Sequence, residues 1–184
     1  MGRRAAAIVV IVLAGLLAAV AAGCGSGSST ASSGDSSQVS NGSKEFLGKG
    51  GKSNKYVKFG QESGVSEREE ISKLVEESFD AREAHDWSGQ CATLSKPVIK
   101  EMEENPGSLG QKGCAKALGT QGKNAPASTL NNNMAGPVGA FRFKATTGYA
   151  LYHGNDKKDY AVSMKKEGGE WKVNALLAEE IPGS

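Results

Sequence analysis

The apolar positions of this chain change their period once, after the stretch APASTLNNNMAG. Before that stretch, apolar side chains recur at spacings of three and four residues, as they do on one face of a helix. The first run predicts a helix that begins at a capping box formed by Ser66 and Glu69 and ends near residues 85–87. Its buried face is expected to consist of Ile71, Leu74, Val75, Ser78 and Phe79.

Two further helical stretches are predicted before the period changes. CATLSKPVIKEMEEN indicates a short helical piece and then a helix that Ser95 caps, with Pro97 tolerated in its first turn. LGQKGCAKALGTQG indicates a brief helix that carries Cys114 and closes at Gly119 or Gly122. The first half of the folded domain is therefore expected to be helical.

Apolar and polar residues then alternate, which is the pattern of half-buried strands. Shared strand faces are predicted for Phe141 with Phe143, for Tyr149 with Leu151, for Tyr160, Val162 and Met164, and for Trp171, Val173, Ala175 and Leu177. GNDKKD and EGGE are turn signals between these runs. Helices followed by an antiparallel meander predict an α+β domain, with one sheet face on the helices and the other toward water.

The N-terminus has the pattern of a secretory signal. Arg3 and Arg4 precede an apolar core, and the small residues Ala21, Ala22 and Gly23 suit a signal peptidase. An uncleaved membrane helix is the alternative, but the uncharged run is of marginal length for a span and no basic stop-transfer cluster follows it. The sequence therefore predicts a signal peptide over residues 1–23.

The residue after this signal predicts where the protein is held. AAGC resembles the lipobox of bacterial lipoproteins, in which the signal is cut before the Cys and that Cys carries the lipid. The resemblance implies acyl chains such as palmitate on Cys24, which would hold the domain at a membrane. Residues 24–55 are Gly-, Ser- and Lys-rich and are expected to be a flexible tether, and residues 56–184 the folded domain. Attraction of the tether lysines to an anionic membrane surface is the alternative to a merely solvated tether.

Charge gives no indication of a nucleic-acid partner. Cleavage of the signal removes Arg3 and Arg4 and leaves 20 basic side chains against 20 acidic ones. Nucleic-acid binding uses a basic surface that releases counterions from phosphates. A nearly neutral mature chain therefore argues against that class of partner.

Two cysteines remain after Cys24, and they allow two interpretations. Outside the cytoplasm a disulfide between Cys91 and Cys114 would persist and would stabilise the fold by roughly 3–4 kcal/mol. Two buried free thiols are the alternative. A metal site would need further ligands, and His85 and His153 do not have the spacing of one. The disulfide is the favoured interpretation, and no metal or cofactor is expected.

Three stretches resemble small bacterial lipoproteins with an NTF2-like (SnoaL-like) domain: EREEISKLVEESFDAREAHDWSGQCATLS, CAKAL and YAVSMKKEGGEWKVNALL. The resemblance implies N-terminal helices packed on a curved antiparallel sheet, a cone that often has a pocket inside. Some members are isomerases, cyclases or dehydratases, and many others are binding or assembly modules. Dimers through the sheet face are common for this fold class, so a homodimer is one expectation.

Candidate chemistry is sparse. His85 and Asp86 suit acid–base work by type, but a helix end explains both residues better, because His there stabilises the last carbonyls and Asp86 can start the next turn. Tyr149 and Tyr160 would donate hydrogen bonds in a pocket or pack as strand residues. The candidate pocket lining is Phe79, Trp87, Phe141, Phe143, Tyr149, Met164 and Trp171, a set that core packing would also explain.

These patterns predict a lipid-anchored protein on the extracytoplasmic face of the cell membrane. Its domain is expected to act as a non-catalytic module that binds a small apolar ligand or another envelope protein. The alternative is a cone-fold enzyme of the isomerase or dehydratase type that acts on a small apolar substrate. A third interpretation is a structural domain with a filled interior.

Overall fold

The computed structural model describes residues 41–49, 51–104 and 111–183. The chain divides into two units, residues 1–35 and residues 36–184, and all described residues belong to the second. The predicted signal peptide and Cys24 therefore lie outside the described residues. Both hydrophobic clusters and the disulfide lie within residues 46–181, so the second unit contains the whole described core.

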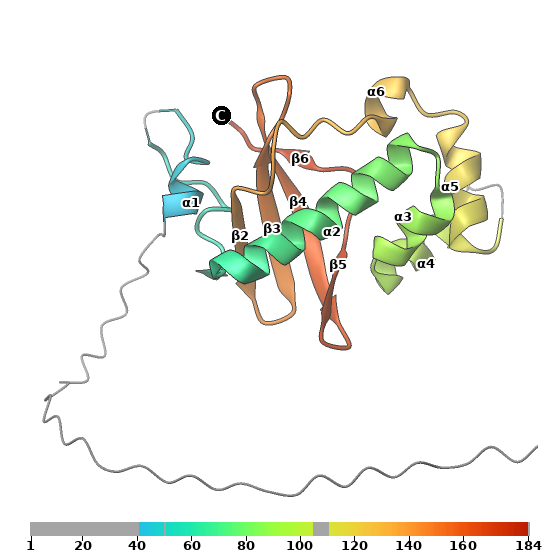
Figure 1. Cartoon of the computed structure of the whole chain (residues 1–184), viewed down its shortest axis with the longest axis horizontal. Coiled ribbons are helices and arrows are strands. Elements are labelled where there is room, and N and C mark those ends of the chain that lie inside the picture. Colours follow the sequence, from blue (N-terminus) through green and yellow to red (C-terminus); the bar gives the residue numbers. More distant parts are fainter. Residues whose placement is uncertain (1–40, 50, 105–110, 184) are drawn as a thin grey trace, which may run out of the picture. The chain divides into compact units, whose positions relative to one another are not determined.

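Helices come first and a sheet follows, as the change of period predicts (Figure 1). The helices are α1 (Asn41–Lys44), α2 (Val65–Glu83), α3 (Trp87–Thr93), α4 (Lys96–Glu104), α5 (Cys114–Gly122) and α6 (Ala127–Leu130). The strands are β1 (Gln61–Glu62), β2 (Ala140–Lys144), β3 (Thr147–His153), β4 (Asp159–Glu167), β5 (Glu170–Val173) and β6 (Glu179–Glu180). The predicted α+β class is confirmed.

All strand pairs are antiparallel, in the order β1-β2-β3-β4-β5, with β6 paired to β4. The long helix α2 crosses one face of this sheet, and α3, α4 and α5 group together beyond its C-terminal end (Figure 1). The sheet is not strongly curled, which differs from the cone that the NTF2-like resemblance implies. The layer between α2 and the sheet contains the larger hydrophobic cluster, with Val75, Phe79, Phe141, Val162 and Met164 at its centre.

The start of α2 differs from the prediction. Gly64 is the N-cap residue and makes no side-chain cap hydrogen bond, and the helix begins at Val65. Ser66 therefore lies inside the first turn, and the amide of Arg68 donates to the Gly64 carbonyl at 3.1 Å. The predicted capping box of Ser66 and Glu69 is wrong, because the extended backbone at Gly64 starts the helix before Ser66 can cap it.

The second sheet face is covered as well. Residues 41–49 and 51–60, which we call the N-terminal strap, lie against this face and bury Phe46, Tyr56 and Val57 at 0%, 1% and 2% exposure. These side chains pack with strand residues Leu151 and Ala161 in a second cluster. The expectation that this face meets water is wrong, and the folded part extends well before residue 56, because the strap brings its own large apolar side chains.

A buried ion pair between β1 and β2 is hydrogen-bonded to the strap. Arg142 is 4% exposed and lies 3.4 Å from a carboxylate oxygen of Glu62. Its guanidinium also donates to the carbonyls of Phe59 and Gly60 at 2.7 and 2.8 Å, and the Ser43 hydroxyl donates to the same Glu62 carboxylate. These bonds compensate Arg142 for lost water, so a charged side chain is tolerated inside the strap–sheet layer.

The last predicted strand is shorter than its pattern suggests. β5 ends at Val173, so Ala175 and Leu177 do not continue the face of Trp171 and Val173. The Val173 carbonyl accepts a hydrogen bond from the Ser95 amide at 2.9 Å, and the chain then leaves the ladder before it returns as β6. Leu177 is consequently 53% exposed beside the helical end of the molecule.

Candidate ligand-binding site

A disulfide fixes the helical end of the domain. Cys91 of α3 and Cys114 of α5 are bonded, with their Cα atoms 6.0 Å apart, so the predicted pairing is confirmed over the alternative of two free thiols. The bridge closes a loop with a sequence separation of 23 residues, which stabilises the fold by about 3–4 kcal/mol in the chain-entropy model. It also holds α3 and α5 together as two walls of one site.

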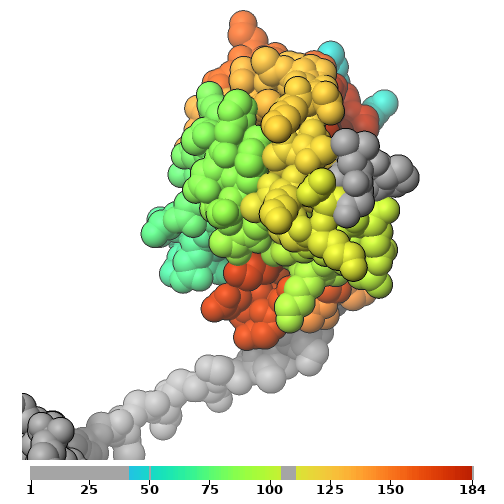
Figure 2. Space-filling view, turned by 90° about the vertical axis from the view of Figure 1, so that its right-hand side faces the viewer, coloured from blue at the N-terminus to red at the C-terminus, as the bar shows by residue number. Residues whose placement is uncertain are grey.

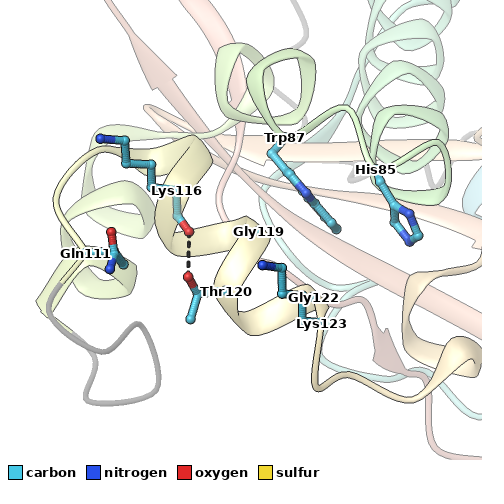
Figure 3. Close-up of a pocket in the computed structure, with 8 residues that line it drawn as sticks. All are labelled: His85, Trp87, Gln111, Lys116, Gly119, Thr120, Gly122 and Lys123. Atoms are coloured by element: carbon cyan, nitrogen blue, oxygen red, sulfur yellow. Dashed lines mark hydrogen bonds between the residues drawn. The ribbon is translucent and has the colours of Figure 1, made fainter.

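Trp87 lies flat against a glycine face of α5. A Cβ atom at Gly119 would come within 3.2 Å of the indole, and one at Gly122 within 2.6 Å. Figure 3 shows the indole turned toward this side of α5, with the His85 ring beside it. Only residues without a side chain leave this room, so the spacing of Gly119 and Gly122 determines where the Trp87 ring lies.

His85 and Asp86 shape the turn that places Trp87. The amides of His85 and Asp86 donate back to Arg82 and Ala81 at 3.1 and 2.7 Å, the pattern of a Schellman C-cap, with His85 at the left-handed position (φ 57°). Asp86 then caps α3 by accepting from the Gly89 amide at 2.9 Å, which confirms that it starts the next turn. The His85 ring stacks on Trp87 with centroids 5.2 Å apart.

An apolar groove of about 180 Å³ opens on the inner side of Trp87. Its walls come from the end of α2, from α3, α5 and α6, and from the segment between β5 and β6. Figure 2 looks onto this side of the molecule, where α5 in yellow lies beside α2 in green. The apolar lining residues are Trp87, Leu118, Ala125, Leu130, Leu176 and Leu177.

Gln90 is one of the residues that line this groove, and its side chain has an unpartnered amide oxygen. The residue is 1% exposed, and its Oε1 atom has no hydrogen-bond partner among the described residues. It lies one helical turn after Trp87, so both side chains share one face of α3. A buried acceptor that is left unsatisfied costs about 1–3 kcal/mol, so the Gln90 side chain destabilises the fold as it lies here.

Arg82 lines the same groove from α2. It is 7% exposed, and its guanidinium donates to the carbonyls of Leu130, Leu176 and Asn131 at 3.2, 2.8 and 3.4 Å. Burial lowers the pKa of Arg82, but a guanidinium keeps its charge in proteins. None of the ion pairs found in the described part of the chain includes Arg82, so its positive charge lies beside the groove without a carboxylate partner.

A second, more polar hollow of about 590 Å³ lies on the outer side of Trp87. It shares Trp87 and Gly122 with the groove, and His85, Lys116 and Lys123 line it as well (Figure 3). His85 and Asp86 are exposed to solvent at this end of the molecule. Trp87 is therefore a wall between an open polar surface and the narrower apolar groove.

Most of the candidate pocket residues meet in or against the larger cluster and do not line the groove. Among the residues predicted as pocket lining, Trp87 lies in the groove, whereas Phe79, Phe141 and Met164 are 2%, 0% and 0% exposed inside the larger cluster. The other three are partly buried: Phe143 and Trp171 pack against that cluster and against each other, and Tyr149 packs against the strap residues Tyr56 and Phe59. Ligand binding at these six positions stays a prediction.

The remaining polar candidates lie away from the groove. His153 ends β3, and its Nδ1 atom lies 2.6 Å from a carboxylate oxygen of Asp159. The Tyr160 hydroxyl donates to Asp156 at 2.7 Å, and this hydrogen bond raises the pKa of Tyr160. Both side chains thus have nearby partners at the β3–β4 turn.

Two residues that matter for the chemistry of the groove, Gln90 and Arg82, were not anticipated as site residues. Gln90 has one sequence signal, its position three residues after Trp87 on the same helix. The signal for Arg82 was weaker: it lies three positions after Phe79, so a charged residue continues the apolar face of α2. The exposed Leu177, expected to lie on a strand face, instead forms the rim of the groove.

Within the described ranges, no group of three or more His, Cys, Asp or Glu side chains is arranged to hold a metal ion. None of the helices in this part of the chain has both the length and the apolar character needed to cross a membrane. Comparison of the chain with protein-family models, with curated proteins and with solved structures found no match.

Proposed function

We propose that this chain is a lipid-anchored extracytoplasmic protein whose folded domain is a non-catalytic binding module, with its ligand site in the groove beside Trp87. The observation that carries the binding role is the groove itself, an apolar hollow that has among its lining residues Gln90, whose side-chain oxygen has no partner among the described residues. Ligand sites combine a mainly apolar lining with a few placed polar groups, and this groove has both.

The anchor is supported by the N-terminal pattern and by the disulfide. AAGC ends an apolar signal-like run, and a Gly- and Ser-rich stretch follows Cys24. The bond between Cys91 and Cys114 suits an oxidising compartment, where structural disulfides persist. Both features favour a location on the outer side of the cytoplasmic membrane.

The NTF2-like resemblance supports the proposal at the level of element order. Helices precede an antiparallel meander, as the resemblance implies. The sheet is not strongly curled, so the proposal places the ligand at the helical end rather than inside a cone. A binding role is therefore argued from the groove and not from family membership.

Replacing Cys24 with serine tests the anchor. The full chain, produced in a lipoprotein-processing bacterium fed labelled palmitate, is expected to carry label and to sediment with membranes, because acylated Cys24 would be its membrane attachment. Cys24→Ser is expected to lose the label entirely. Cys91→Ser is the matched control, since it also removes one sulfur but should keep the label. Equal labelling of the wild-type chain and Cys24→Ser would contradict the proposed anchor.

A further inference from the structure

We propose that the groove selects a small, uncharged amphiphile whose head group both donates and accepts hydrogen bonds, as a primary amide does. This inference rests on the proposed binding role and adds the chemical class of the ligand. It is carried by three features of the groove: the unpartnered oxygen of Gln90, the unpaired charge of Arg82, and the small apolar volume between them and Leu177.

Gln90 calls for a hydrogen-bond donor. Its Oε1 atom is an acceptor, is buried with the residue at 1% exposure, and receives no hydrogen bond from the described residues. The backbone carbonyl of Gln90 is already used by the Thr93 hydroxyl at 2.7 Å, which places Thr93 at the helix end and not at the side-chain amide. Because Oε1 has almost no accessible surface, a ligand N–H or O–H in the groove would satisfy it by turning the Gln90 amide toward the groove, and that bond would remove the cost of burying the oxygen.

Arg82 restricts the charge of that donor. Ammonium groups donate hydrogen bonds, but a cation in this groove would lie beside a guanidinium that forms no ion pair within the described part of the chain. Three of its five N–H groups are used by backbone carbonyls, which leaves N–H groups for a ligand acceptor. A carboxylate would satisfy Arg82 but has no proton to donate to Gln90. An uncharged amide satisfies both side chains.

The volume restricts the size of the ligand. The groove measures about 180 Å³, which is less than the roughly 300–1,000 Å³ of pockets that hold drug-sized ligands. Its walls are leucines, Ala125 and the Trp87 indole, so the body of the ligand would be apolar. Leu177 forms an exposed rim (53%), where burial of the ligand would also cover an apolar side chain.

Three molecules with the same six-carbon chain test the inference: hexanamide, hexanoate and hexylammonium. The protein is residues 36–184, which contain both core clusters and the disulfide, with Trp171→Phe so that Trp87 is its only tryptophan. Binding is followed by Trp87 fluorescence, since the indole is a wall of the groove. We expect hexanamide to bind about tenfold more tightly than either charged molecule, the ratio that one satisfied hydrogen bond provides.

Variants of two lining residues identify the site. Gln90→Leu keeps the groove apolar and removes the acceptor, so the preference for hexanamide should disappear while the fold keeps or gains stability. Leu177→Ser should weaken the binding of all three molecules severalfold, because the rim of the groove loses apolar area. Val65→Ser is the matched control, since Val65 is the other well-exposed large apolar side chain (60%) among the described residues, and the substitution should leave binding unchanged.

Equal binding of the three molecules, or a preference for hexanamide that survives Gln90→Leu, would overturn the inferred ligand class while leaving a ligand groove in place. Binding of none of them would overturn the inference and the groove as a small-molecule site. In that case lipid labelling of Cys24, measured on the full chain, would still decide separately whether the anchor stands. The two failures are therefore distinguishable.

Discussion

Replacing Phe46 with alanine is expected to lower the free energy of unfolding by about 3–5 kcal/mol, the cost of removing a fully buried aromatic side chain. Phe46 is 0% exposed in the second cluster, and its ring fills the space that a Cβ at Gly139 would occupy, at 2.9 Å. It also stacks on His153 with centroids 4.6 Å apart. Urea unfolding of residues 36–184 measures the change.

Lys49→Ala is the control for this experiment. Lys49 belongs to the same strap but is exposed, so its loss should change stability by less than about 0.5 kcal/mol. Unfolding of Phe46→Ala at the same urea concentration as Lys49→Ala would contradict the packing of the strap on the sheet. The strap would then behave as the solvated tether that its lysines suggest.

The double substitution Cys91→Ser and Cys114→Ser is expected to cost about 3–4 kcal/mol, mainly because the unfolded chain regains the freedom that the closed loop removes. The effect on the groove should be larger than the effect on the sheet, since the bridge joins α3 to α5 and not to any strand. Urea unfolding gives the stability, and backbone amide exchange shows which elements loosen.

Faster exchange in α3 and α5 than in β3 and β4 is the expected pattern for the serine variant. Unfolding of the wild-type protein under reducing conditions is the matching control. Its free energy of unfolding should fall by the same amount as in the serine variant, without any change of sequence. Equal stability of the bridged and unbridged proteins would show that the disulfide is dispensable for the helical end of the domain.

The sheet face against α2 could be predicted from the sequence because one physical rule determines it. Phe141 with Phe143, and Val162 with Met164, alternate with polar residues, and each pair faces the larger cluster. The local alternation is enough to predict which residues are buried, since successive side chains along a strand point to opposite faces of the sheet. The same rule failed at Leu177, because β5 ends at Val173 and residue 177 no longer lies on the strand.

The burial of the second sheet face could have been predicted from β3, where an uninterrupted apolar run replaces the alternation of apolar and polar residues. Residues 149–152 of β3 are all apolar or aromatic, as expected for a strand covered on both faces. Their partner, the strap, has a lysine-rich composition that resembles a linker, although Phe46, Tyr56 and Val57 supply a buried face. Composition averaged over the segment concealed these three side chains.

The groove was only partly predictable. Trp87 was a candidate as a large aromatic residue, and the structure places it in the groove. Gln90 and Arg82 were not candidates, because the burial of a polar side chain depends on tertiary partners such as the carbonyls of Leu130 and Leu176. Such partners come from distant parts of the chain and leave no local pattern.

Native mass spectrometry of the domain tests the groove as the ligand site most directly. Residues 36–184, produced in an oxidising compartment and purified without detergent, are expected to carry one small uncharged molecule that is lost on denaturation. Ala125→Trp, which places a large side chain in the groove from its partly exposed wall, is expected to show the bare protein with the disulfide intact. An adduct that persists in Ala125→Trp, or bare protein in both samples, would contradict the groove as the ligand site.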